Sequence, residues 1–187
     1  NHFKIVNQDI EFNIKSFGFI VDRFDIFCKL MKLPDASFSV DNNQLFYTIG
    51  ELTLKISTAE EIFIIYEIFF KKCYEVVFEN EYNVIDIGMN VGFASLFFAQ
   101  NRKIKKIYGY EPFKPTFDAA LANFKLNEKY AQKIYPENFG LWSKNEDLTV
   151  SYNDIQRGKN KIRTSGIEDM ESIHLYRADD IIEAILK

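Results

Sequence analysis

From residue 81 onward, short apolar stretches alternate with amphipathic stretches of helical length, and this alternation restricts the possible folds more than any other feature of the chain. Strands that alternate with helices in this way form a parallel sheet with right-handed crossovers. The predicted strands are 83–88, 106–112, 132–142, 147–154 and 172–178, and the predicted helices are 92–101, 114–127 and 179–187. Residues 81–187 are therefore predicted to form an α/β domain.

Residues 1–80 have a different pattern and are predicted to form an N-terminal α+β extension. Apolar residues recur at helical spacing over 17–31, which predicts an amphipathic helix that ends before Pro34. The stretch 37–57 alternates as short antiparallel strands do. A second helix is expected to follow it, with Ser57 or Thr58 and Glu60 or Glu61 forming a capping box. We expect the many aromatic residues of this half to fill a core rather than to form a lid over a substrate.

The charge balance and the few cysteine and histidine residues argue against several classes of function. Lys plus Arg is 23 and Asp plus Glu is 27, so the net charge is −4, and the chain lacks the basic character that binding of nucleic acid requires. The two cysteines, Cys28 and Cys73, are predicted to be buried free thiols. No His, Cys and carboxylate residues have the spacing of a metal site. The longest apolar run, 62–70, is about half as long as a membrane span, and no signal peptide is recognisable, so the expected compartment is the cytoplasm.

The stretch VIDIGMNVGFASLFFA, residues 84–99, has glycine and polar residues at alternate positions where the first strand of the sheet is expected to end. They form the pattern D-x-G-x-N-x-G, which differs from the G-x-G-x-x-G pattern of nicotinamide cofactor sites. Glycines at this place permit positive φ angles and leave room for a ligand. Glu111 ends the next strand, where an acidic side chain can accept both hydroxyls of a ribose. The spacing alone predicts a site for a nucleoside cofactor.

The same residues resemble a known family. The loop and the following stretch IYGYEPFKPTFDAALANFKLN (107–127) are similar to the FkbM family of S-adenosylmethionine-dependent methyltransferases. Members of that family have a D-x-G-A-N-x-G loop and a strand that ends in an aromatic residue, Glu and Pro, and Met89 stands here where alanine is usual. The stretch ENFGLWSKNEDLTV (137–150) also resembles the family. The resemblance covers residues 60–186 and implies the first half of a Rossmann-like methyltransferase sheet.

By this resemblance, the ends of the first three strands hold S-adenosylmethionine. The loop after the first strand would line the methionine and ribose portions, and Glu111 would bind the ribose hydroxyls. Phe113 would lie near the adenine, and 138–140 would lie at its edge. The cofactor-binding residues implied in this way are Asp86, Gly88, Met89, Asn90, Gly92, Glu111, Pro112, Phe113, Asn138, Phe139 and Gly140.

The resemblance assigns no catalytic residue. The family's fourth strand, whose end carries residues beside the transferred methyl group, is expected only after Lys187, so the domain is expected to be truncated. The later segment has four polar candidates, each of which we expect to be a surface or capping residue. These are Tyr152, Asp154, His174 and Asp179, and Asp179 or Asp180 is expected to cap the last helix.

The function implied by the resemblance is methylation of an oxygen atom of a sugar or a secondary metabolite. A module that binds a cofactor or nucleoside without catalysis is one alternative, and an unrelated nucleotide-dependent enzyme such as a reductase is another. Without a fourth strand, the strand at 84–88 has an open edge, which predicts a homodimer that pairs through this edge. The alternative is that 172–178 folds back to cover it.

Overall fold

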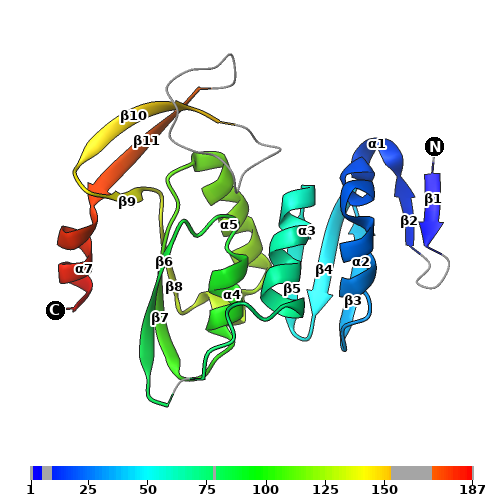
Figure 1. Cartoon of the computed structure of the whole chain (residues 1–187), viewed down its shortest axis with the longest axis horizontal. Coiled ribbons are helices and arrows are strands. Elements are labelled where there is room, and N and C mark those ends of the chain that lie inside the picture. Colours follow the sequence, from blue (N-terminus) through cyan, green and yellow to red (C-terminus); the bar gives the residue numbers. More distant parts are fainter. Residues whose placement is uncertain (1, 6–9, 78, 153–169, 187) are drawn as a thin grey trace. The chain divides into compact units, whose positions relative to one another are not determined.

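The computed structural model describes residues 2–5, 10–77, 79–152 and 170–186. The chain divides into two compact units, Asn1–Val76 and Val77–Lys187 (Figure 1). Each unit buries its own set of apolar side chains. Among the residues that the structure describes, no helix has the length and apolar character to cross a membrane.

The first unit contains a three-stranded antiparallel sheet of order β3-β4-β5. Asn42 and Asn43 have φ angles of +46° and +59°, as a tight hairpin between β3 and β4 requires. In the core, the rings of Phe27 and Phe38 are stacked, with centroids 3.9 Å apart, and the ring of Tyr47 lies tilted against Phe38 at 4.7 Å, so these aromatic residues fill a core as predicted. The elements are β1 (His2–Ile5), β2 (Ile10–Asn13), α1 (Ile14–Phe17), the 3-10 helix η1 (Gly18–Arg23), α2 (Phe24–Leu30), β3 (Ala36–Asp41), β4 (Gln44–Ile49), β5 (Leu52–Ile56), α3 (Ala59–Ile65) and the π-helical turn η2 (Tyr66–Phe70).

The predicted capping box is confirmed at the start of α3, and the structure selects among its members. The hydroxyl of Thr58 accepts the N–H of Glu61 at 3.2 Å, and the Glu61 carboxylate accepts the N–H of Ser57 at 2.6 Å. Two otherwise unpaired backbone donors are satisfied in this way. The prediction of two buried thiols is wrong, because Cys28 is half-buried and Cys73 is exposed. Cys73 lies three residues beyond the end of η2, where the chain has left the buried face of that helix.

The second unit is built on a three-stranded parallel sheet of order β6-β7-β8. Helices α4 and α5 follow the first and second of these strands and lie on the same face of the sheet (Figure 1). This arrangement confirms the predicted α/β class and the Rossmann-like order of the first three strands. The elements are β6 (Tyr82–Ile87), α4 (Phe93–Ala99), β7 (Ile104–Tyr110), α5 (Lys114–Leu126), α6 (Glu128–Ala131), β8 (Ile134–Glu137), β9 (Gly140–Trp142), β10 (Glu146–Ser151), β11 (Met170–Arg177) and α7 (Ala178–Leu186).

The predicted third strand, 132–142, is two strands that belong to different sheets. β8 ends at Glu137 in the parallel sheet, and β9 pairs in parallel with β11, which in turn pairs antiparallel with β10. The chain changes sheets at Asn138 and Phe139, shortly after Pro136, which has no N–H with which to continue a ladder. The sequence left open whether the third strand continues past Pro136, and in the structure it continues by one residue, to Glu137.

Strand β6 lies at an open edge of its sheet. Within the described ranges its only strand partner is β7, and β11 pairs with β9 and β10, so the fold-back alternative is wrong. The N–H of Gly88 donates to the carbonyl of Tyr110 at 3.0 Å, toward β7. Because this direction alternates along a strand, the peptide groups of Asn83, Ile85 and Ile87 face the open edge.

Candidate functional site

The loop after β6 reverses the chain over the end of β7. The N–H groups of Gly88 and Met89 both donate to the carbonyl of Tyr110, at 3.0 and 2.9 Å. Three of the five loop residues have positive φ angles: +75° at Gly88, +53° at Asn90 and +82° at Gly92. Asn tolerates this left-handed conformation better than most residues, and glycine adopts it without strain. The glycine and asparagine pattern of the sequence is therefore required by the backbone of the loop.

The two glycines of this loop have different surroundings. A Cβ atom on Gly88 would meet no heavy atom within 4 Å, so open space lies beside it. A Cβ atom on Gly92 would lie 2.6 Å from Cε1 of Phe124, on α5. The absence of a side chain at Gly92 thus admits Phe124 and allows α4 and α5 to pack closely. Of the two glycines, only Gly88 has open space beside it.

The side chain of Met89 points away from that space. It is 2% exposed and fills the gap over Gly109 in β7, where an added Cβ atom would lie 2.3 Å from the Met89 sulfur. Only the backbone of Met89 is therefore placed to meet a ligand in the loop. Sequence reasoning did not single out Gly109, although its position within the buried strand stretch IYGYEP is a signal of a close approach.

Asp86 is the last residue but one of β6, two positions before Gly88. Its carboxylate accepts the hydroxyl proton of Ser95 in a 2.6 Å hydrogen bond. Ser95 is fully buried in the first turns of α4, and sequence reasoning did not assign it a role. Burial raises the pKa of Asp86, and the hydrogen bond from Ser95 partly opposes this effect.

Glu111 follows the end of β7 and is 5% exposed. One of its carboxylate oxygens accepts the N–H of Asn90, and the other accepts the N–H of Phe113, both at 3.0 Å. Burial raises the pKa of Glu111 to about 7, the two backbone hydrogen bonds oppose this shift, and the nearby charge of Asp86 adds to it. Glu111, which the sequence predicts to bind a ribose, thus already joins the loop after β6 to the residue that precedes α5.

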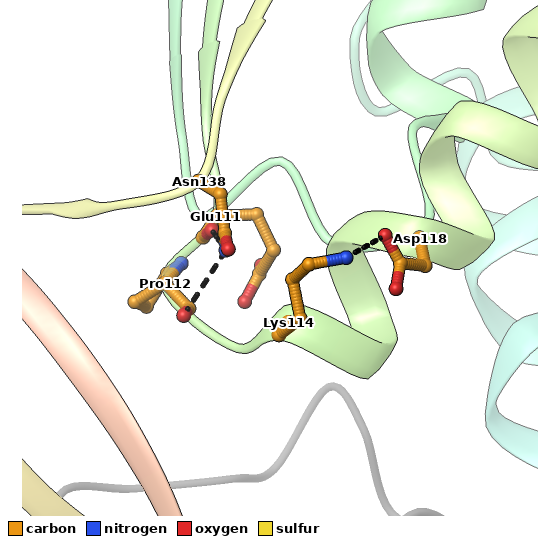
Figure 2. A network of polar contacts seen from close by, with 5 residues as sticks. All are labelled: Glu111, Pro112, Lys114, Asp118 and Asn138. Carbon is orange, nitrogen blue, oxygen red and sulfur yellow. Dashed lines mark hydrogen bonds and ion pairs between the residues drawn. The ribbon is translucent and has the colours of Figure 1, made fainter.

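Asn138 supports the backbone next to Glu111. Its side-chain amide donates to the carbonyl oxygens of Glu111, at 2.9 Å, and Pro112, at 3.2 Å (Figure 2). Lys114, at the start of α5, directs its ammonium group along the helix to Asp118 (Figure 2). The side chain of Asn138, which the sequence predicts to lie in the site, thus fixes the end of β8 to the end of β7.

The aromatic residues of the predicted site face different surroundings. Phe113 is 7% exposed and packs in a cluster with Val150, Ile173 and Leu175 and with the ring of Tyr152, so its side chain belongs to a core. Phe139 is half-buried, with ring centroids 5.1 Å from Tyr110 and 4.7 Å from Tyr176. Gly140 lies in β9, where an added Cβ atom would lie 2.6 Å from a methyl carbon of Leu175.

The described polar candidates of the later segment have partners outside the loop after β6. Tyr152 is buried and shares a 3.0 Å hydrogen bond with the hydroxyl of Thr116. His174 pairs with Asp147 across the exposed face of the β10–β11 ladder, at 2.7 Å. Asp179 accepts hydrogen bonds from the guanidinium of Arg177, and Asp154 lies outside the described residues.

Chemically, this arrangement fits a ligand that carries positive charge. Asp86 and Glu111 lie at adjacent strand ends, where Glu111 is buried and Asp86 is half-buried, and no Lys, Arg or His of the described ranges pairs with either carboxylate. A carboxylate that is withdrawn from water without a cationic partner is costly, and a cation bound beside it removes much of that cost. The open space at Gly88 adjoins the same loop. In the part of the chain that the structure describes, no group of three or more His, Cys, Asp or Glu is arranged to hold a metal ion.

No protein-family model and no curated protein matches the chain. Among solved structures, the chain is similar to the methyltransferase FkbM from Methylobacillus flagellatus KT, at 14% identity and a TM-score of 0.39, over 62% of this chain and 27% of that one. It is also similar to TYW2 from M. jannaschii in complex with AdoMet, at 14% identity and a TM-score of 0.33, over 75% of this chain and 84% of that one. The chain thus spans little more than a quarter of the length of that FkbM methyltransferase. At these identities and TM-scores, neither similarity assigns a family or an activity to this chain.

Proposed function

We propose that the chain binds S-adenosylmethionine and forms the cofactor-binding part of a methyltransferase of the FkbM type, which methylates an oxygen atom of a sugar or a secondary metabolite. The observation that supports this proposal is a pair of carboxylates without a cationic partner, the buried Glu111 and the half-buried Asp86, beside a loop with open space at Gly88. The residues that resemble the FkbM family, D-x-G-x-N-x-G and Y-E-P, are those that build this arrangement.

S-adenosylmethionine carries a sulfonium and an ammonium group, and when bound it supplies an electrophilic methyl group. The carboxylates of Asp86 and Glu111, neither of which has a cationic partner among the described residues, provide the negative potential that these groups need. Each oxygen of Glu111 accepts one backbone N–H and keeps a second lone pair, which can accept a ribose hydroxyl. Asp86 is the second negative group, and Ser95 fixes its orientation. Phe113, whose ring is in a core, is placed to contribute its backbone rather than its side chain.

Titration calorimetry with S-adenosylhomocysteine and S-adenosylmethionine tests this proposal. The wild-type chain is expected to bind both, and Glu111→Ala is expected to weaken binding by about 1–3 kcal/mol because it removes charge-assisted hydrogen bonds. Asp118→Asn is the matched control, since this exposed carboxylate pairs only with Lys114 on the surface of α5. A folded wild-type chain that binds neither compound below millimolar concentration would refute the proposal.

A binding module without catalysis is the second candidate. It is favoured by the position of His174, which lies on the exposed face of the β10–β11 ladder, paired with Asp147, rather than at the strand ends near Asp86 and Glu111. Transfer of a labelled methyl group to sugar or small hydroxyl-containing acceptors separates the two candidates, since a binding module retains the cofactor and transfers nothing. Calorimetry with nicotinamide dinucleotides tests the reductase alternative in the same samples.

We also propose that the protein works in the cytoplasm. Cys28 and Cys73 are free thiols, which is the usual state of cysteines in a reducing compartment. Fractionation of cells that express the protein tests this proposal.

A further inference from the structure

The Glu111 carboxylate joins the two loops that border the candidate site. Its Oε2 accepts the N–H of Asn90, in the loop after β6, and its Oε1 accepts the N–H of Phe113, the residue that precedes α5. The side chain is 5% exposed, so water has little access to these donors. Both hydrogen bonds require an acceptor oxygen, which the ionised carboxylate supplies twice.

Asn90 is the part of the loop that depends most on this connection. The beginning of the loop is held by the carbonyl of Tyr110, which accepts the N–H groups of Gly88 and Met89. Asn90 has a φ angle of +53°, and its side-chain oxygen accepts the N–H of Val91 at 2.7 Å. A non-glycine residue in this conformation requires support from its surroundings. The N–H of Asn90 donates a hydrogen bond to the Glu111 carboxylate, which supplies this support.

The charges around Glu111 place its proton equilibrium close to neutral pH. Asp86, at the end of β6, repels its negative charge. Lys114, on α5, is paired with Asp118. Glu137, the last residue of β8, accepts the N–H of Glu111 through its backbone carbonyl at 3.1 Å, and its side chain is exposed. The segments 88–92 and 138–140 contain no titratable side chain. Burial dominates and raises the pKa of Glu111 to about 7.

We propose that Glu111 is a proton-controlled latch, which fixes Asn90 to the start of α5 when it is ionised and releases Asn90 when it takes up a proton. Protonation converts one carboxylate oxygen into a hydroxyl, which is a weaker acceptor and carries a hydrogen that must itself find an acceptor. One of the two backbone N–H groups then loses its charge-assisted partner. Phe113 immediately precedes α5 and its ring is packed in a core cluster, so its N–H is held in place and the connection to the loop is the one that opens.

Amide NMR of the ligand-free chain tests the latch without any cofactor. The amide proton of Asn90 is expected to shift with pH between about 5.5 and 8.5, with the midpoint that the ¹³Cδ signal of Glu111 shows in the same sample. In Glu111→Gln, which keeps the shape of the side chain but cannot ionise, the Asn90 amide is expected not to titrate. Glu137→Gln, which removes an exposed carboxylate at the neighbouring strand end, is expected to leave the titration of Asn90 in place.

Two results of this NMR experiment would overturn the proposal. One is an Asn90 amide that stays constant while the Glu111 carboxyl titrates, and the other is an Asn90 titration that persists in Glu111→Gln. If Glu111→Gln does not fold, the comparison of the two midpoints in the wild-type chain still decides the question.

The consequence for binding rests on the proposed function. Affinity for S-adenosylhomocysteine is expected to fall by about tenfold for each pH unit below the midpoint, and Glu111→Gln is expected to show weak affinity at every pH. An Asn90 titration without any cofactor binding would leave the latch in place and refute the proposed ligand. Cofactor binding that does not depend on pH would refute the latch and keep the proposed ligand.

Discussion

Gly92 and Gly88 form a matched pair of sites at which alanine is expected to have different effects. Both have φ angles in the left-handed region, +82° and +75°, so alanine costs about 1–2 kcal/mol at either position. At Gly92 the new methyl group would also lie 2.6 and 2.8 Å from two ring carbons of Phe124, an overpacking that adds about 1–3 kcal/mol. Gly92→Ala is therefore expected to reduce the free energy of unfolding by about 2–5 kcal/mol, and Gly88→Ala by only about 1–2 kcal/mol.

The single tryptophan of the chain provides the assay. Trp142 lies in β9, so its fluorescence during urea denaturation reports on the second unit. A double-mutant cycle with Phe124→Leu isolates the steric contribution, because the smaller side chain gives the methyl group room. The double variant is expected to be more stable than the sum of the two single changes indicates, by about 1–3 kcal/mol. Equal destabilisation by Gly88→Ala and Gly92→Ala, or an additive cycle, would refute the assignment of Gly92 to helix packing.

Three further predictions follow from the second unit. The free energy of unfolding of this unit is expected to fall by about 3 kcal/mol at most as the pH rises from about 5 to 8. The reason is the raised pKa of Glu111, which makes the folded state bind more protons than the unfolded state in this window. Urea denaturation of Glu111→Gln at several pH values is expected to show no such dependence on pH. Gly109→Ala is expected to destabilise the fold by about 1–3 kcal/mol because the new methyl group would contact the Met89 sulfur. Adding Met89→Ala to the same chain is expected to recover part of the lost stability. A stability that does not recover would contradict this contact. We propose that a second copy of the chain pairs with the open edge of β6. Sedimentation is expected to show a concentration-dependent dimer, and Ile87→Lys is expected to abolish that dimer. A monomer at all concentrations would argue against this pairing.

The order of the first three strands of the second unit could be predicted from the sequence, because apolar periods and helix lengths are local properties. The alternation over 81–127 indicates β6, α4, β7 and α5 with little error, and the turn chemistry of Asn42 and Asn43 indicates the hairpin of the first unit. The position at which the third strand changes sheets could not be predicted in this way. It depends on β11, which is distant in the sequence and pairs with β9.

The site residues show the same limit. The pattern D-x-G-x-N-x-G identifies a loop with positive φ angles, but only the packed structure shows that Gly92 accommodates Phe124 while Gly88 adjoins open space. Ser95 could not be assigned to the site from the sequence, because a single serine in an apolar helix matches no motif. Its role is to donate a hydrogen bond to Asp86, which only the fold brings next to it. Phe113 follows the strand-end motif closely in sequence, yet its ring packs against the β10–β11 ladder, a contact that the local sequence does not encode.

The passage of the chain from β8 to β9 has a mechanical consequence. Along the chain, Asn138 and Phe139 lead from the parallel sheet to the sheet that contains β9, and the amide of Asn138 donates to the carbonyl groups of Glu111 and Pro112. The ring of Phe113 and the hydrogen bond between Thr116 and Tyr152 also attach the β10–β11 ladder to the start of α5. The backbone on both sides of Glu111 is therefore tied to the second sheet, so a displacement of the β10–β11 ladder would be transmitted to the strand end that carries this carboxylate.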